Sequence, residues 1–195
     1  MQEEKKRFPR FELPVRRAIT RYGVPNSELV ESHYMLQSLE DGCSESDAER
    51  LEAICNEELI YERLFRNRLH GQPYTRAHAE AFLLWAREGW AKWEWFVFVV
   101  RDPQGQIVAA LDIKSADPGA AEIGYWASVT SRGVMTNAVV ALCQVAQDAG
   151  YACLYAHIAP DNGPSLGVVR RAGFQPDGEV QIQDQRYLKW TRKLM

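Results

Sequence analysis

The fold is decided by residues 121–149, AEIGYWASVTSRGVMTNAVVALCQVAQDA. Residues 121–127 are short, apolar and aromatic, which is typical of a buried β-strand. Residues 128–133, SVTSRG, are mostly small and end in a glycine. The run that follows repeats apolar residues at the spacing of one helix face, and Gly150 stops it. The stretch therefore predicts a strand, a short loop and an amphipathic helix.

Such a junction is suited to binding an anion. Unpaired backbone N–H groups at the start of a helix point toward one spot, and the positive end of the helix dipole lies behind them. A diphosphate binds readily there, and small side chains let it approach the backbone. The alternative is an ordinary turn with a capping serine or threonine, because one glycine is a weak signal.

A second unit of the same kind follows. Residues 152–158, ACLYAHI, read as a strand, and a short helix extends from the segment DNGPS (161–165) to Ala172. Pro164 suits the first helical turn and Gly173 suits the end of the helix. The segment therefore predicts a second strand, loop and helix.

The order EIGYW, SRGVMTNA and APDNGPSLGVVRRAGF resembles the GNAT superfamily of acyl-CoA-dependent N-acyltransferases, most closely its Rim-type ribosomal-protein N-terminal acetyltransferases. The resemblance runs from about Ser44 to the C-terminus and is strongest over 122–174. It implies an α/β (α+β) fold whose central mixed, mostly antiparallel twisted sheet splays between two parallel strands, with helices on both faces. It also implies acetyl-CoA as co-substrate and a primary amine, either a protein N-terminus or a small amine, as acceptor.

In that family the loop after the fourth strand reads Gln/Arg-x-x-Gly-x-Gly/Ala and holds the cofactor pyrophosphate. Here Ser128 stands at the Gln/Arg position, Ser131 at the first glycine and Gly133 at the second, and the loop is about two residues short. Serine tolerates a positive φ poorly. The resemblance assigns these residues to the cofactor: Ala127, Val129, Ser131, Arg132, Gly133, Val134, Met135, Thr136, Asn162 and Ser165.

Acetyl transfer to an amine requires a neutral amine, an N–H donor for the oxyanion and a proton for the departing thiolate. Glu122 is the only acid in its predicted strand, so it is the candidate general base, acting directly or through water. The alternative is a surface or ion-paired glutamate, and Asp112 is another acid that could act. We interpret His157 as an ordinary strand histidine.

By resemblance, Asn162 holds the pantetheine arm and Ser165 lies near the sulfur as the proton donor. Many GNAT enzymes use a tyrosine on this helix, but residues 163–173 contain none. Helix capping by the same two side chains is the alternative. The sequence therefore predicts an N-acetyltransferase with Glu122 and Ser165 as catalytic residues. The altered loop motivates the alternative of a catalytically weak acyl-CoA-binding or protein-interaction module.

Composition narrows the classes of protein and of partner that remain. The chain has 195 residues, of which 46% are hydrophobic and 25% charged, as in a soluble globular domain. The net charge of -3 argues against a nucleic-acid partner. An apolar run long enough to span a membrane and a secretory signal are both missing, so we expect a cytoplasmic protein without a membrane partner. Four cysteines, Cys43, Cys55, Cys143 and Cys153, lack metal-binding spacing, so we expect no metal.

We divide the chain into an N-terminal extension (1–30) and a single GNAT domain (31–195). In the extension, residues 15–22 are predicted as a short helix ending at Gly23. The extension packs over the acceptor groove or a partner subunit in one interpretation, and is a mobile terminus in the other. Edge strands and the C-terminal hairpin make a homodimer a reasonable expectation.

The rest of the domain reads as alternating helices and strands. Expected strands cover 32–39, 95–100, 106–113, 178–183 and 185–191. Ser46 and Glu49 have capping-box spacing before a first helix. A second helical piece follows Asn56, and a third helix runs from Thr75 to near Gly89. By resemblance, residues 64–74 form one wall of the acceptor groove.

Overall fold

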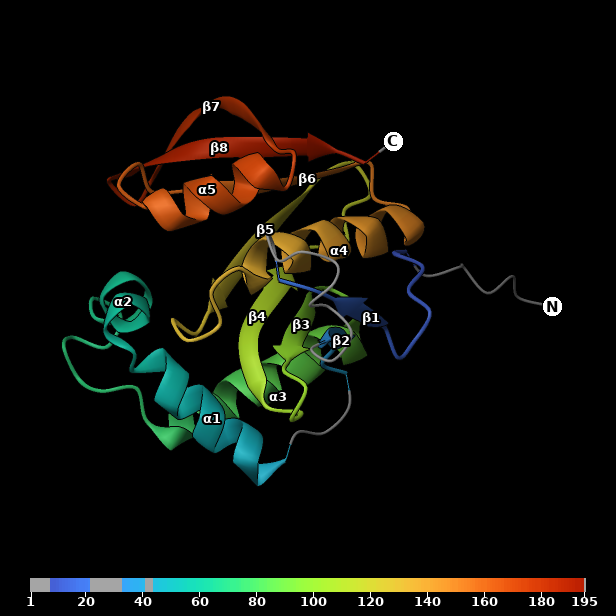
Figure 1. Ribbon diagram of the computed structural model, residues 1–195. Coiled ribbons are helices and arrows are strands. Elements are labelled where there is room, and N and C mark those ends of the chain that lie inside the picture. Colours follow the sequence, from blue (N-terminus) through green and yellow to red (C-terminus); the bar gives the residue numbers. More distant parts are fainter. Residues whose placement is uncertain (1–7, 22–32, 41–43, 195) are drawn as a thin grey trace.

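The computed structural model describes residues 8–21, 33–40 and 44–194. Within them, eight strands form one sheet in the order β1-β2-β3-β4-β5-β6-β8-β7 (Figure 1). All neighbours are antiparallel except the parallel pair β5–β6. The strands are β1 (Arg16–Ile19), β2 (Tyr34–Ser38), β3 (Phe96–Arg101), β4 (Ile107–Ile113), β5 (Ala121–Ala127), β6 (Cys153–Ile158), β7 (Gln175–Ile182) and β8 (Gln185–Lys193). The expected mixed, mostly antiparallel sheet is confirmed.

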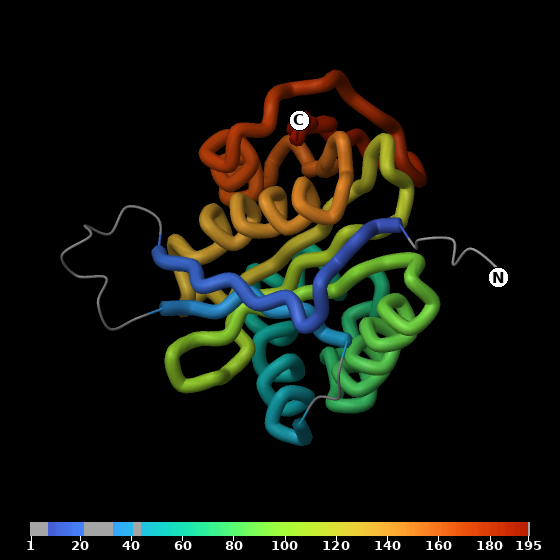
Figure 2. The backbone as a smooth tube through the Cα atoms, turned by 90° about the vertical axis from the view of Figure 1, so that its right-hand side faces the viewer, coloured from blue at the N-terminus to red at the C-terminus, as the bar shows by residue number. Residues whose placement is uncertain are grey.

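Helices cover both faces of this sheet, as predicted. They are α1 (Glu45–Cys55), α2 (Glu58–Ile60), the π-helical turn η2 (Tyr61–Phe65), α3 (Arg76–Lys92), α4 (Val134–Asp148) and α5 (Gly163–Arg171). α1 and α3 pack together on one face, and α4, with α5 against it, packs on the other (Figures 1 and 2). The strand–loop–helix units predicted from residues 121–149 and 152–172 are therefore β5–α4 and β6–α5.

Strand β3 shows how the two faces are filled. Phe96 and Phe98 belong to the core under α4, whereas Val97 and Val99 belong to the core under α1 and α3. Successive side chains of a strand point to opposite faces, so a strand buried on both sides is apolar throughout. This is why residues 95–100 lack the alternation of a half-exposed strand.

The predicted helix over residues 15–22 is wrong, because residues 16–19 form strand β1, paired antiparallel with β2. Val15 and Ile19 are both buried, and a spacing of four residues fits one helix face and alternate residues of a strand equally well. Pairing with β2 supplies the backbone hydrogen bonds that a helix would have made internally. Gly23 and Ser32, the expected end of that helix and start of the next strand, lie outside the described residues.

The N-terminal segment packs against the sheet beside α4 (Figure 2). The backbone N–H of Arg10 donates to the carbonyl of Ala149 at 3.0 Å. The ring of Phe11 contacts those of Trp90 and Phe96, with centroids 5.2 and 4.8 Å apart. These contacts join residues 8–19 to the core of the domain.

Two helix ends differ from the sequence prediction. Helix α1 is capped by Ser44 and Asp47 rather than by Ser46 and Glu49, and its capping box is complete. Helix α3 continues beyond Gly89 to Lys92. A Cβ atom at Gly89 would lie 2.3 Å from Nε1 of Trp95, so this glycine allows close packing instead of ending the helix.

The described cysteines are unpaired thiols. Cys55 and Cys143 are buried, and burial raises the pKa of Cys143 to about 11. Cys43 lies outside the described residues. Among residues 8–21, 33–40 and 44–194, no three His, Cys, Asp or Glu side chains are grouped to hold a metal ion, and none of the helices has the length and apolarity to cross a bilayer.

Candidate active site

A cleft opens where the two parallel strands separate. β5 and β6 pair only at Ala121–Leu154 and Glu122–Tyr155, after which they diverge. The cleft between them has a volume of about 770 Å³. Divergence leaves backbone N–H and C=O groups of both strands without a ladder partner, so they can bind a ligand instead. The expected splay is confirmed.

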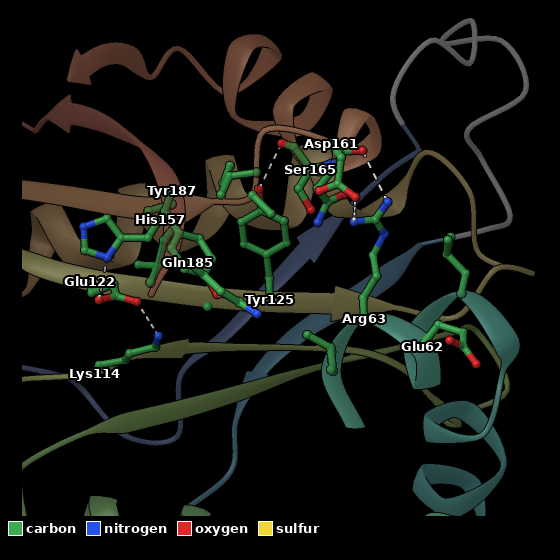
Figure 3. A pocket seen from close by; sticks show the side chains of 18 of the residues that line it. Glu62, Arg63, Lys114, Glu122, Tyr125, His157, Asp161, Ser165, Gln185 and Tyr187 are labelled. Carbon is green, nitrogen blue, oxygen red and sulfur yellow. Dashed lines mark hydrogen bonds and ion pairs between the residues drawn. The ribbon is translucent and has the colours of Figure 1, made fainter. Parts of the chain in front are cut away.

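The cleft is bounded by four parts of the chain (Figure 3). β5 and β6 line its base, residues of α2 and η2 form one wall, the start of α5 forms the other, and Gln185 and Tyr187 of β8 lie beside β6. Of the predicted wall, residues 64–74, only Leu64 lines it. Asn56 holds Tyr74 by two hydrogen bonds, of 2.6 and 3.0 Å, so the rest of that loop packs back toward α1.

Glu122 lies in this cleft, on β5 at the last β5–β6 pair. Lys114 forms an ion pair with its Oε1, and Nδ1 of His157 lies 3.2 Å from its Oε2. The side chain of Glu122 is 24% exposed. The sequence left open whether Glu122 is a candidate general base or an ion-paired glutamate. The structure shows that it both faces the cleft and is ion-paired. His157, interpreted as an ordinary strand histidine, also lines the cleft.

Asp112 does not line the cleft. It pairs with Gly124 across β4 and β5, and a Cβ atom at Gly124 would lie 2.4 Å from its Oδ1. Burial raises the pKa of Asp112, although the Lys114 ammonium and the Gly124 backbone N–H act against this. Asp112, on the neighbouring strand β4, thus packs against Gly124 of β5. Glu122 is the carboxylate of β5 that a substrate in the cleft can reach.

Asn162 and Ser165 lie at the start of α5, and both line the cleft. Oδ1 of Asn162 accepts a hydrogen bond from the backbone N–H of Ser165 at 3.2 Å, which is the capping contact that the sequence offered as an alternative. The hydroxyl of Tyr125 donates to the Ser165 carbonyl at 3.1 Å. Glu122, Asn162 and Ser165 therefore line the same cleft, and the roles assigned to them stay predictions.

An ion pair joins the two walls at one end of the cleft. Arg63 of η2 donates to Oδ2 and to the backbone carbonyl of Asp161, each at 3.3 Å (Figure 3). Asp161 precedes Asn162, so this pair links the α2–η2 wall to the loop that carries α5. π-Helical turns such as η2 are frequent at functional sites.

The loop from Ser128 to Gly133 follows the C-terminal end of β5. Of its residues, all described, only Gly133 has a positive φ, of 86°. Ser131 at the position of the first family glycine therefore causes no backbone strain. The part of the chain that the structure describes offers no hydrogen-bond partner for the N–H groups of Arg132 and Gly133.

The assigned cofactor residues form two groups. Asn162 and Ser165 line the cleft, whereas the others lie at the end of β5 and the start of α4: Ala127, Val129, Ser131, Arg132, Gly133, Val134, Met135 and Thr136. The side chains of Ser131, Val134, Met135 and Thr136 are buried, and the N–H groups of Ser131 and Val134 donate to the carbonyls of Ser128 and Ser131 at 3.0 and 3.4 Å. The N–H of Val129 is bonded to Glu57 at 2.7 Å.

Sequence reasoning did not find Tyr125, Arg63, Lys114 or Glu57 as site residues. Tyr125 and Arg63 contact residues 40 and 98 positions away. No local spacing in the sequence reveals such contacts. Lys114 has a weak signal, because it lies just beyond β4 and pairs across to Glu122 once the two strands are known to be neighbours.

Comparison with known proteins gives a family match and a shared fold. Residues 42–175 match the family described as Acetyltransferase (GNAT) domain. None of the curated proteins matches the chain. Among solved structures, RimJ of Mycobacterium smegmatis in complex with CoA-disulfide is similar with a TM-score of 0.71 at 16% identity, covering 93% of this chain and 88% of that one.

Two further solved structures have the same fold. RimL, a ribosomal L7/L12 α-N-protein acetyltransferase in complex with coenzyme A, has a TM-score of 0.67 at 14% identity, with 91% of this chain and 98% of that one covered. The microcin C7 self-immunity acetyltransferase MccE, in complex with acetyl-CoA and AMP, has a TM-score of 0.64 at 18% identity, with 81% and 92% covered.

Proposed function

This chain belongs to the GNAT acetyltransferase family, and from that premise we propose that it moves the acetyl group of acetyl-CoA directly to a primary amine, on a protein N-terminus or a small molecule. The observation that carries the proposal is the cleft at the β5–β6 divergence, which holds Glu122, Asn162 and Ser165 together. RimL is described as an α-N-protein acetyltransferase, which supports an N-terminal amine as one acceptor class.

Acetyl-CoA enters along the loop that begins α4. The N–H groups of Arg132 and Gly133 and the positive end of a 15-residue helix face the diphosphate there. The pantetheine arm then runs between β5 and β6, where the divergence leaves backbone groups to bond it, and Asn162 contacts it from α5. Arg132 is exposed, so its side chain can add a positive charge.

Transfer needs no covalent enzyme intermediate. Glu122 accepts a proton from the ammonium of the acceptor, directly or through water, and the neutral nitrogen attacks the thioester carbon. A backbone N–H of the splayed strands stabilises the oxyanion. The C–S bond then breaks, the sulfur keeps the electron pair, and the hydroxyl of Ser165 donates a proton to it, while the new amide nitrogen loses its extra proton to water. In the view of Figure 3, Tyr125 lies between Glu122 and Ser165.

The proposal is tested by calorimetric titration with acetyl-CoA and with CoA, followed by turnover with a panel of amines and N-terminal peptides. We expect saturable micromolar binding of acetyl-CoA and release of free CoA thiol that depends on an amine. Binding without turnover for every acceptor would favour an acyl-CoA-binding module. Absence of binding would contradict both the enzyme and that module. We also propose a cytoplasmic location and a homodimer, which cell fractionation and light scattering test.

A further inference from the structure

Tyr125 crosses the cleft where the strands stop pairing. It lies on β5, three residues beyond the last β5–β6 pair at Glu122. Its hydroxyl donates a hydrogen bond to the backbone carbonyl of Ser165 at 3.1 Å (Figure 3). Ladder hydrogen bonds hold the two strands together only at Ala121 and Glu122, so beyond that point a side chain links β5 to the β6–α5 unit.

The backbone of Ser165 is held at both of its polar groups. Asn162 accepts from its N–H at 3.2 Å, and Tyr125 donates to its C=O. Its side chain lines the cleft and lies within hydrogen-bonding reach of the Tyr125 hydroxyl. The residue is thus fixed by its backbone, with its side chain at the cleft and next to Tyr125.

We propose that Tyr125 is a positioning residue for acetyl transfer, which sets the distance between β5 and Ser165 so that the serine hydroxyl meets the departing sulfur. The inference rests on the proposed function. In this step the C–S bond breaks with its electron pair on sulfur and Ser165 gives its proton to that sulfur; the serine is reprotonated through water by the proton that the new amide nitrogen releases. Tyr125 gives up no proton.

The chemistry of Tyr125 suits this role. Burial raises its pKa, although the contacts with Ser165 and Arg171 act in the other direction. The hydroxyl therefore stays protonated throughout the neutral range and keeps donating to the carbonyl. Catalytic groups must be held within a fraction of an ångström of the productive geometry, and supporting hydrogen bonds of this kind provide that constraint.

The test compares Tyr125→Phe with a matched control, Tyr151→Phe. Tyr151 is a buried tyrosine whose hydroxyl likewise donates to a distant backbone carbonyl, that of Ser115, at 2.8 Å, and it does not line the cleft. Each substitution removes one hydroxyl and keeps the ring. We expect Tyr125→Phe to lower kcat about tenfold while the KM for acetyl-CoA changes less than about twofold, and Tyr151→Phe to change neither.

The same substitution in a Ser165→Ala variant separates a positioning role from a general structural effect. If Tyr125 acts through Ser165, then Tyr125→Phe lowers kcat less than about twofold when Ser165→Ala is already present. An equal loss in both backgrounds would overturn the proposal, because Tyr125 would then act directly or through the whole fold. Wild-type kcat in Tyr125→Phe, or in Ser165→Ala, would overturn it as well.

Failure of the proposed function is recognised separately. If the wild-type protein acetylates no amine, the link is judged by amide hydrogen exchange in the protein without ligand. We then expect residues 163–171 to exchange faster in Tyr125→Phe than in the wild type and in Tyr151→Phe, at an unchanged melting temperature. Equal exchange in all three proteins would overturn the positioning role.

Discussion

The carboxylate of Glu57 accepts a hydrogen bond from the backbone N–H of Val129 at 2.7 Å, and its second oxygen accepts one from the hydroxyl of Ser128 at 2.6 Å. Glu57 precedes α2, so this contact joins the wall of the cleft to the loop that leads into α4. An anionic side chain therefore occupies an N–H group that the family resemblance assigns to the pantetheine arm of the cofactor, and its charge lies beside the loop that we propose holds the diphosphate.

Glu57→Gln is expected to bind acetyl-CoA about fivefold more tightly, a change of about 1 kcal/mol. The amide keeps the size of the side chain but removes a negative charge next to the diphosphate. Calorimetric titration measures the change, with Glu52→Gln on α1 as the control. Weaker binding in Glu57→Gln would mean that the carboxylate supports the loop and does not compete with the cofactor.

Glu122→Gln is expected to lower kcat about 100-fold, the contribution of a typical general base, and to leave the Kd of acetyl-CoA within about twofold. Glutamine keeps the shape of the side chain but cannot take up a proton. Steady-state turnover and calorimetry measure the two effects. Glu179→Gln, which removes a charge from an exposed ion pair outside the cleft, is the matched control. Wild-type turnover in Glu122→Gln would exclude Glu122 as the base.

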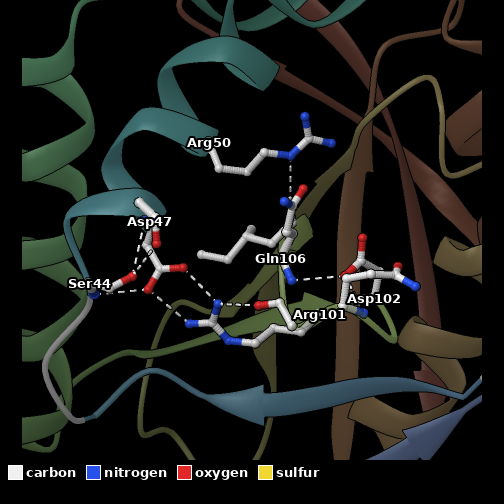
Figure 4. Close-up of polar contacts among 10 residues, drawn as sticks. Ser44, Asp47, Arg50, Arg101, Asp102 and Gln106 are labelled. Atoms are coloured by element: carbon white, nitrogen blue, oxygen red, sulfur yellow. Dashed lines mark hydrogen bonds and ion pairs between the residues drawn. The ribbon is translucent and has the colours of Figure 1, made fainter.

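Asp47 gives the protein a pH-dependent stability (Figure 4). Burial alone would raise the pKa of its carboxyl, but hydrogen bonds from Arg101 and Ser44 outweigh this effect and hold the pKa below its usual value. An Arg101 guanidinium nitrogen lies 2.6 Å from Oδ1 of Asp47, and the Asp47 and Arg101 side chains are only 7% and 20% exposed. Since the pKa is depressed in the folded state, the stabilisation is present above the unfolded pKa of about 4 and is lost as the pH falls through the folded value.

We therefore expect Asp47→Asn to lower the free energy of unfolding by about 2 kcal/mol at pH 7, because a charge-assisted hydrogen bond is lost. The difference from wild type should shrink as the pH falls below about 4. Urea unfolding at pH 7, 5 and 3 measures it. A difference that stays constant with pH would show that Asp47 stabilises only as the cap of α1.

Gly124→Ala is expected to destabilise the fold by about 1 to 3 kcal/mol, as overpacking does. The new methyl group would lie 2.4 Å from Oδ1 of Asp112, so the carboxyl must move. In an Asp112→Ala background the same substitution should cost less than about 0.5 kcal/mol. Thermal unfolding of the four proteins measures both costs. Equal costs in the two backgrounds would contradict the clash with Asp112.

Much of the fold was predictable from local patterns. Residues 121–127 form β5 with the bounds that the sequence predicts, and Gly133 takes the positive φ that its position requires. These features depend on a run of neighbouring residues, so a single sequence contains them. The helix expected at 15–22 failed because Val15 and Ile19 fit both periodicities, and a partner strand 15 or more residues away decided between them.

The candidate site divides in the same way. Glu122, Asn162 and Ser165 were found from the sequence because each occupies a motif position of its own strand or helix. Tyr125, Arg63 and Glu57 were not, because each is defined by a partner far along the chain.

By itself, the sequence determined the two strand–loop–helix units, the family resemblance and the acid and hydroxyl that the proposed chemistry uses. Only the tertiary structure decided that β5 and β6 part after Glu122, that Tyr125 holds Ser165 across the opening, and that Glu57 lies against the Val129 N–H. The physical reason is that periodicity and capping are properties of neighbouring residues. Cleft width and hydrogen-bond partners, in contrast, depend on where the folded chain brings distant residues together.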